Sequence, residues 1–235
     1  MKVSVIVPTY QERDNIEPLV RRIAAALGGW DYEVIVVDDN SPDGTAEVAA
    51  GLAEKYPVRL IRREGVRGLG SAILEGFKNA EGNTLGVIDA DLQHPPEIIP
   101  ELLTAIQHGS DIAIASRYVR GGGIEGWSTV RRLISKVAVL VARPLTSVKD
   151  PMSGCFLLSR RVIDGISLTS KGYKILLEIL VKGQYHHVAE VPYIFTERRS
   201  GRSKLGLREC LNYMTLLANL CLHRIVRRQV PGSKV

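Results

Sequence analysis

Two carboxylates and one amide lie close together in the segment Asp89-Ala90-Asp91-Leu92-Gln93, directly after the apolar run 85–88. On an extended segment, side chains two residues apart project to the same side, so Asp89 and Asp91 are expected to face one ligand. Two such carboxylates repel each other unless a cation joins them. Mg²⁺ and Mn²⁺ take oxygen ligands, and Mg²⁺ commonly combines a few carboxylates with substrate phosphates. The segment therefore predicts a site for a metal ion and a diphosphate.

An isolated Asp-x-Asp also fits a solvated turn with helix-capping aspartates. The buried run before it, Gln93 and the pair Asp38-Asp39 favour the metal site here. Three other polar segments also follow apolar runs, namely 8–12, 38–44 and 116–118. Ligands of an open parallel α/β sheet bind beyond the carboxyl ends of its strands. The four segments are therefore expected to converge on one edge of a sheet.

The elements that must position these residues alternate over the first 115 residues. Short runs rich in Val and Ile, apolar at nearly every position, are typical of strands buried on both faces. They lie at 3–7, 34–37, 58–61, 85–88 and 112–115, and helical patterns lie between them at 15–27, 45–56, 69–80 and 97–107. This alternation predicts an α/β fold with a doubly wound, mostly parallel, Rossmann-like sheet.

The pattern changes after Ser116. A basic and apolar segment at 131–141 precedes a turn at 150–154, a short apolar run, a helix around 173–181 and a last strand near 188–195. An amphipathic helix is expected at 207–226. We predict a catalytic domain over residues 1–205, and a C-terminal amphipathic, basic helix and tail over 206–235.

The net charge of +6 is unevenly distributed, because residues 196–235 hold nine Lys and Arg but only two Glu. Such a segment fits a solvated tail, an anionic membrane surface, an anionic substrate or a nucleic acid. Three cysteines and an N-terminal strand in place of a signal peptide favour the cytoplasm. No run of about 18–20 apolar residues predicts a transmembrane helix.

Several common sites are excluded by spacing. The glycines at 68 and 70 lack the third glycine of a dinucleotide fingerprint, and neither a P-loop nor a Gly-x-Ser-x-Gly elbow occurs. His94, His186 and His187 lack the spacing of a zinc site and are expected to be surface or structural residues.

Three strings resemble a known family: 5–12 (Val-Ile-Val-Pro-Thr-Tyr-Gln-Glu), 36–45 (Val-Val-Asp-Asp-Asn-Ser-Pro-Asp-Gly-Thr) and 89–97 (Asp-Ala-Asp-Leu-Gln-His-Pro-Pro-Glu). They resemble the inverting family 2 glycosyltransferases, which have the GT-A fold. The run Asp-Leu-Gln-His-Pro-Pro and the late Ser-Lys-Leu are narrower signals. They resemble the polyprenyl-phosphate sugar synthases, and most closely the dolichol-phosphate mannose synthases. The segments 116–118, 150–154 and 201–206 extend the resemblance over nearly the whole chain.

The resemblance implies a role for each matching residue. The nucleoside of the donor would be held by Pro8, Tyr10, Glu12, Val37 and Asp39. The ribose and diphosphate would lie along Asp89, Ala90 and Asp91, with Mg²⁺ or Mn²⁺ on Asp91 and Gln93. Arg117, Arg198 and Lys204 would meet phosphates of donor or acceptor, while Arg117, Arg131, Ser135 and Arg202 would meet the acceptor phosphate. Asp91 and Arg117 are the expected catalytic residues. Gln11 replaces the more usual Asn, with little expected consequence because Glu12 is retained.

The implied reaction is inverting transfer of mannose from GDP-mannose to dolichyl or another polyprenyl phosphate, giving dolichyl β-D-mannosyl phosphate. A phosphate monoester has a second pKa of about 6, so this acceptor is already a nucleophile at neutral pH and needs no carboxylate base. The alternatives are a UDP-glucose-dependent glucosyltransferase of the same fold and a non-catalytic basic, lipid-binding or scaffolding protein. No nucleic-acid partner is expected, because no recognition motif accompanies the charge.

The acceptor also implies a membrane surface as partner. Residues 133–142 and the helix 207–226 offer apolar faces edged by arginines, suited to the cytoplasmic face of an anionic membrane. Ordinary packing on the α/β domain is the alternative for both. Many relatives carry transmembrane helices after the catalytic domain. Since this sequence shows no such helix, we expect a peripheral protein, a separate membrane-anchoring subunit or a shortened chain.

Overall fold

The computed structural model describes residues 1–169, 174–196 and 207–229, and the side chains of the last helix over 211–225. Its core is a seven-stranded sheet in the order β3-β2-β1-β4-β7-β5-β8. The strands are β1 (Lys2–Thr9), β2 (Asp31–Asp38), β3 (Val58–Arg62), β4 (Thr84–Ile88), β5 (Ile112–Ser116), β7 (Cys155–Ser159) and β8 (Val188–Pro192). The short strands β6 (Gly123–Ile124) and β9 (Ile194–Phe195) form a second, parallel pair. The predicted doubly wound, mostly parallel α/β fold is confirmed.

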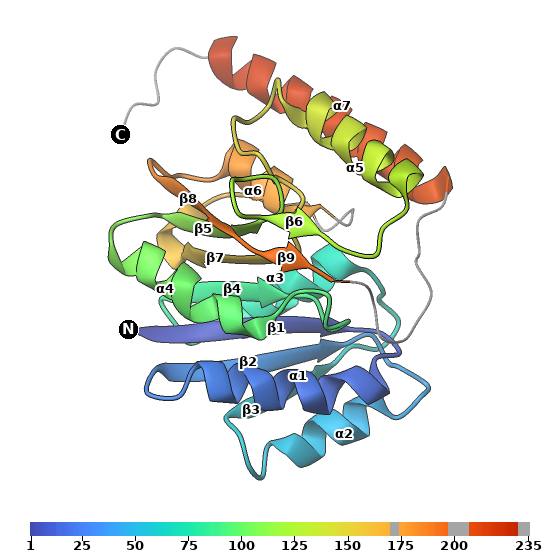
Figure 1. Ribbon diagram of the computed structural model, residues 1–235, viewed down its shortest axis with the longest axis vertical. Coiled ribbons are helices and arrows are strands. Elements are labelled where there is room, and N and C mark those ends of the chain that lie inside the picture. Colours follow the sequence, from blue (N-terminus) through green and yellow to red (C-terminus); the bar gives the residue numbers. More distant parts are fainter. Residues whose placement is uncertain (170–173, 197–206, 230–235) are drawn as a thin grey trace.

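Helices cover both faces of the sheet (Figure 1). α1 (Arg13–Ala26), α2 (Thr45–Leu52) and α4 (Ile99–Gln107) lie on one face, and α3 (Leu69–Asn79) and α6 (Ile175–Lys182) lie on the other. Alternation along β1 shows why the sheet needs both layers. Val5 belongs to the core beneath α1, while Ile6 belongs to the core beneath α3.

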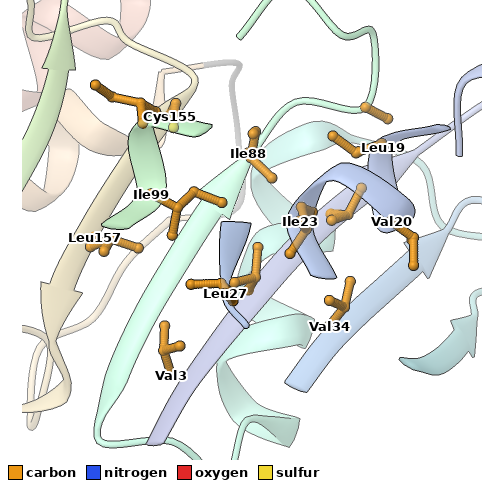
Figure 2. Close-up of a cluster of buried hydrophobic side chains, with 14 of the residues drawn as sticks. Val3, Leu19, Val20, Ile23, Leu27, Val34, Ile88, Ile99, Cys155 and Leu157 are labelled. Atoms are coloured by element: carbon orange, nitrogen blue, oxygen red, sulfur yellow. The ribbon is translucent and has the colours of Figure 1, made fainter. Parts of the chain in front are cut away.

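The core on the α1 face is shown in Figure 2. Leu19, Ile23 and Leu27 of the α1 segment are fully buried against Val3 and Val34 of the sheet. Their spacing of three to four residues places them on one helix face, which is the pattern that predicted this helix. Pro18 lies in the second turn of α1 without breaking it.

Two details differ from the prediction. β7 runs antiparallel to both of its neighbours, β4 and β5, which the apolar run alone did not reveal. α2 ends at Leu52, four residues before the predicted end at 56. The chain forms a turn after Leu52, in which the N–H groups of Lys55 and Tyr56 both donate to the Leu52 carbonyl. Pro57 disfavours helical conformation at Tyr56 alone.

α5 (Thr129–Ala142) and α7 (Leu207–Gln229) lie side by side at one end of the molecule (Figure 1). The Tyr213 hydroxyl donates to the Ala138 carbonyl at 2.7 Å, and Leu217 packs in the cluster that contains Ala142. In the described part of the chain, no helix is long and apolar enough to span a membrane. The predicted boundary between residues 205 and 206 lies outside the described residues, so the division into two parts stays a prediction.

Candidate active site

The loops after β1 and β2 lie at the right-hand side of the sheet in Figure 1 and are tied together by Asp38, the last residue of β2. Its carboxylate accepts hydrogen bonds from the Thr9 hydroxyl at 2.9 Å, from the Ser41 hydroxyl at 2.6 Å and from the Ser41 N–H at 2.8 Å. Gln11 and Asn40 have left-handed backbones, with φ of 60° and 53°. Residues other than glycine adopt this backbone conformation rarely, so both loops contain fixed, unusual turns.

Asp39 is buried next to Arg63, a residue that the sequence analysis did not single out. Arg63 donates to Asp39 Oδ1 from Nε at 2.8 Å and also from Nη2. The Gly68 N–H donates to Asp39 Oδ2 at 2.8 Å, and Arg63 Nη1 donates to Ser71 Oγ at 2.9 Å. The carboxylate is therefore fixed at the end of β2, and the loop 63–68 is tied to it.

The other residues predicted to hold a nucleoside surround these two loops. Pro8 and Val37 are buried register partners on β1 and β2. Tyr10 follows β1, and the guanidinium of Arg67 lies 4.6 Å from the centre of its ring. Glu12 lies directly before α1. The structure brings these residues and Asp39 to one edge of the sheet.

The segment 89–93 is a tight turn and not an extended strand. β4 ends at Ile88, and Leu92 has a φ of 59°. The expectation that Asp89 and Asp91 lie on an extended segment is therefore wrong. Asp91 is buried and accepts a hydrogen bond from the Gln93 N–H at 3.1 Å, while Gln93 Nε2 donates to the Thr196 carbonyl at 3.1 Å.

These contacts test whether the turn fits a divalent cation. The bond to Thr196 uses the amide nitrogen of Gln93 and so fixes the orientation of its amide oxygen. Asp91 lies two residues away and shares a hydrogen bond with the Gln93 backbone. A carboxylate and an amide oxygen are ligands suited to Mg²⁺ or Mn²⁺. Ala90, between the two aspartates, is buried and packs in the core beneath α1.

A second turn presses against Asp89. A Cβ added to Gly154 would lie 2.6 Å from Asp89 Cγ, so a larger residue fits only if the Asp89 side chain moves. His94 Nε2 lies 3.7 Å from Asp89 Oδ2, beyond hydrogen-bond distance, and its ring stacks on Tyr193. Burial, with the charges of Arg117 and Lys174, lowers the pKa of His94 to about 3. His94 is thus a buried, neutral packing residue. This agrees with the prediction of a structural role and excludes the alternative of a surface residue.

Arg117 follows β5 and is held by Asp150 of the second turn. Its Nε and Nη2 donate to the two carboxylate oxygens at 2.7 Å each, and its backbone N–H donates to Oδ2 at 3.0 Å. Burial opposes the charge, but the hydrogen bonds and charge of Asp150 raise the pKa of Arg117. Trp127 and Phe195 lie against the guanidinium at 5.7 and 5.3 Å. Arg117 is therefore a permanent, oriented cation.

Two predicted acceptor residues, Arg131 and Ser135, belong to α5 and are connected to Arg117 through aromatic side chains. The Tyr118 hydroxyl donates to Ser135 Oγ at 2.8 Å. The guanidinium of Arg131 lies 4.1 Å from the centre of the Trp127 ring, which Arg117 also contacts. Arg117, Arg131 and Ser135 are therefore linked through two aromatic residues into one surface.

A small basic cavity opens beside this surface. It has a volume of about 170 Å³ and is lined by Arg117, Tyr118, Ile124, Arg132 and Lys136. Lys136 could not be predicted as a site residue, because a lysine on an amphipathic helix resembles any solvated residue. Lys174 was not predicted either, and its pKa is lowered by burial and by the charge of Arg117. Lys136 adds positive charge to the cavity that Arg117 lines.

Three predicted phosphate-binding residues, Arg198, Arg202 and Lys204, lie outside the described residues. Their roles stay predictions. The described residues form two groups at one edge of the sheet: the residues predicted to hold the nucleoside and the metal, after β1, β2 and β4, and a cationic group after β5 and on α5. Asp89 and Gly154 form the contact between them.

Comparison with known proteins agrees with this architecture. The model of the glycosyl transferase family 2 matches residues 4–166. A dolichol-phosphate mannosyltransferase of Pyrococcus furiosus is 50% identical over 99% of this chain and 68% of its own. The enzyme of the same name from Saccharomyces cerevisiae is 41% identical over 94% of this chain and 87% of its own.

The fold is also found among solved structures. Glucosyl-3-phosphoglycerate synthase from Mycobacterium tuberculosis superposes over 100% of this chain and 82% of its own, with a TM-score of 0.69 and 20% identity. At that identity the likeness shows the fold alone. The family match and the sequence relatives go further: the chain belongs to glycosyl transferase family 2 and, within it, to the family of the dolichol-phosphate mannosyltransferases.

Proposed function

We propose that the protein transfers mannose from GDP-mannose to dolichyl or another polyprenyl phosphate, with inversion at C1. The observation that carries this proposal is the contact between the turn that contains Asp89 and the turn that contains Gly154. The contact supports the proposal because it joins the turn that we propose to bind metal and diphosphate to the turn whose Asp150 orients Arg117. Relatives 41–50% identical carry the name dolichol-phosphate mannosyltransferase, which supports the substrates.

The donor would lie along the first group of residues. Pro8, Tyr10, Glu12, Val37 and Asp39 would hold the nucleoside, and Asp89 and Ala90 would lie along the ribose and diphosphate. Asp91 and Gln93 would hold Mg²⁺ or Mn²⁺, which supplies Lewis-acid stabilisation of the leaving diphosphate when bound. Tight turns fix these side chains before any substrate arrives, so little reorganisation is needed.

The acceptor would approach Arg117 from the side of α5. Asp150 holds one edge of the guanidinium through Nε and Nη2, so the remaining N–H groups can bind an acceptor phosphate. Arg131 and Ser135 would bind the same phosphate. A phosphate dianion is already a nucleophile, so a cation that orients it can replace a general base. Arg198, Arg202 and Lys204 are proposed to add positive charge.

A lipid acceptor requires a membrane surface, and α5 with α7 offers one. Leu133 and Leu140 of α5 are 62% and 67% exposed, and Leu211 of α7 is 68% exposed. Arg132 and Lys136 lie on α5 beside these apolar side chains. Apolar side chains flanked by cations suit the anionic cytoplasmic face of a membrane. We propose peripheral binding there, with or without a membrane-anchoring subunit.

The test is product analysis with radiolabelled GDP-mannose, Mn²⁺ and a set of polyprenyl phosphates. We expect label in a mild-acid-labile polyprenyl product of β configuration. The rival of the same fold is a UDP-glucose-dependent enzyme. Tighter binding of UDP than of GDP in calorimetry, with transfer of glucose in place of mannose, would overturn the assignment of the donor.

A further inference from the structure

Glu190 on β8 is the centre of a hydrogen-bond network behind Arg117. Its Oε1 accepts from the Ser116 hydroxyl at 2.8 Å and from the Asp150 N–H at 3.0 Å. Its Oε2 accepts from the Lys149 N–H at 2.9 Å. All three partners are donors, so both carboxylate oxygens must accept. A carboxylate meets this demand, whereas an amide would turn N–H groups toward at least one of the donors.

The partners of Glu190 are the residues that hold Arg117. Asp150 binds the guanidinium and the backbone N–H of Arg117, and Ser116 is the residue before it. Glu190 therefore fixes both ends of the Arg117 side chain: its backbone through β5, and its guanidinium through the 149–150 turn. β5 and β8 are parallel neighbours, with Ile114 and Glu190 in register, which brings Glu190 to this position.

Glu190 also lines a cavity of about 460 Å³ on the side of Tyr185 and Arg224. Its two oxygens are nevertheless bound to donors of the Arg117 network. The contacts thus associate Glu190 with Arg117 and not with a ligand of that cavity.

We infer that Glu190 is a positioning residue for Arg117, and through it for the acceptor phosphate. This inference rests on the proposed function, because Arg117 has this role only if the acceptor is a phosphate. Glu190 does not touch substrate; it acts by fixing the turn that orients the arginine. Loss of this orientation would impair the use of the acceptor and leave the nucleotide site on β1 and β2 intact.

Glu33 provides a matched control. It is a buried glutamate on β2 that accepts hydrogen bonds from the Ser4 hydroxyl at 2.6 Å, the Glu81 N–H at 2.7 Å and Arg59 at 2.9 Å. It lies near the start of its strand, at the edge of the sheet opposite to the site. Glu33→Gln and Glu190→Gln therefore remove the same charge from carboxylates with equally many bonds.

The experiment compares the two variants in the full chain by unfolding, GDP binding and steady-state transfer. We expect Glu190→Gln to lower kcat/KM for the polyprenyl phosphate by about 10- to 100-fold, the range for a small misplacement of a catalytic group. Its affinity for GDP should stay within about twofold of wild type. Glu33→Gln should leave both kcat/KM for the polyprenyl phosphate and the affinity for GDP within about twofold of wild type. Equal kinetic effects of the two variants would overturn the inference.

A double-variant cycle separates positioning from general damage. In an Arg117→Ala background, Glu190→Gln should lower transfer by less than about twofold further, because the residue it positions is gone. A further loss as large as that in wild type would contradict the inference. Glu190→Asp, which keeps a carboxylate, should recover part of the activity.

A fluorescence measurement tests the inference independently of mannose transfer. Trp127 lies against Arg117, so its fluorescence, read in a Trp30→Phe background, reports the position of the arginine. Glu190→Gln should shift this emission in the same direction as Arg117→Ala, and unchanged emission would overturn the inference. Failure of wild type to transfer mannose would overturn the proposed function, while the fluorescence would still decide the role of Glu190.

Discussion

Gly154 lies against the carboxylate of Asp89, and a Cβ at position 154 would come within 2.6 Å of Asp89 Cγ. This contact joins the turn after β4 to the turn before β7. The first turn carries the proposed metal ligands and the second carries Asp150, the partner of Arg117. Any larger residue at position 154 would therefore have to displace the carboxylate of Asp89.

Substitution of this glycine should impair transfer. In Gly154→Ala, the new methyl group must displace Asp89, and we expect kcat/KM for GDP-mannose to fall by about 10-fold or more. Gly51, on α2, is the control, because no atom lies within 4 Å of a Cβ built there. Gly51→Ala should keep wild-type kinetics and stabilise the protein by about 0.5–1 kcal/mol. Normal kinetics in Gly154→Ala would show that the contact is dispensable.

The buried ion pair of Arg117 and Asp150 should contribute strongly to the free energy of unfolding. Asp150→Ala leaves a buried guanidinium without its counter-charge, so we expect the free energy of unfolding to fall by about 3–5 kcal/mol. Replacing both residues by apolar ones of similar volume, as in Arg117→Met with Asp150→Leu, should recover most of this loss while transfer stays far below that of wild type. Urea denaturation measures the first effect and the transfer assay the second. A double variant that transfers mannose as fast as wild type would refute the role of Arg117.

Asp111 should make stability depend on pH at the acidic end. Burial opposes its charge, but hydrogen bonds from the N–H groups of His187 and His186, with the nearby Arg161, lower the pKa of Asp111 to about 2. A carboxylate whose pKa is lower in the folded state than its unfolded value of about 3.9 stabilises the fold above that value. This contribution, about 2 kcal/mol, is lost as the pH falls from about 4 to 2.

The variant Asp111→Asn tests this dependence. Urea denaturation at pH 7 should show it less stable than wild type, and the difference should shrink toward pH 2. Asp164→Asn, at an exposed position, should follow wild type throughout. A constant difference between Asp111→Asn and wild type from pH 7 to pH 2 would show that the charge of Asp111 does not contribute.

The apolar face of α5 should bind membranes. Leu133→Glu with Leu140→Glu places two charges on side chains that are 62% and 67% exposed, so the fold should be little affected. We expect binding to phosphatidylserine-containing vesicles to weaken by at least about 10-fold, because apolar burial and attraction to anionic lipid are both reduced. Val66→Glu, in the loop after β3, is the control. Sedimentation with vesicles measures the difference, and equal binding of both variants would exclude this face.

Much of the fold follows from local patterns. β1, β2, β4 and β5 are largely buried on both faces, which explains their apolar runs, and the helices between them repeat apolar residues every three to four positions. β3 lies at the edge of the sheet, and its Arg59 and Arg62 are exposed. The direction of β7 has no such signal. Cys155–Ser159 is as apolar as its neighbours β4 and β5, yet it runs antiparallel to both, so its direction depends on pairing with strands that are distant in the sequence.

The site divides in the same way. The turn with Asp91 and Gln93 could be recognised because its residues are adjacent in the chain. Arg63 and Lys174 could not, because their partners lie far away in sequence and a single cation has no local pattern. The extended geometry expected for Asp89 and Asp91 failed, since the left-handed backbone of Leu92 closes a turn that residue types alone do not specify.

The central claim is that the turn holding Asp91 serves mannose transfer to a polyprenyl phosphate. The most direct measurement follows radiolabel from GDP-mannose into polyprenyl phosphate with Mn²⁺, for wild type and Asp91→Ala. We predict transfer by wild type and a loss of at least about 100-fold in the variant, since a metal contributes several kcal/mol. Unchanged transfer by Asp91→Ala, or no transfer by wild type, would contradict the claim.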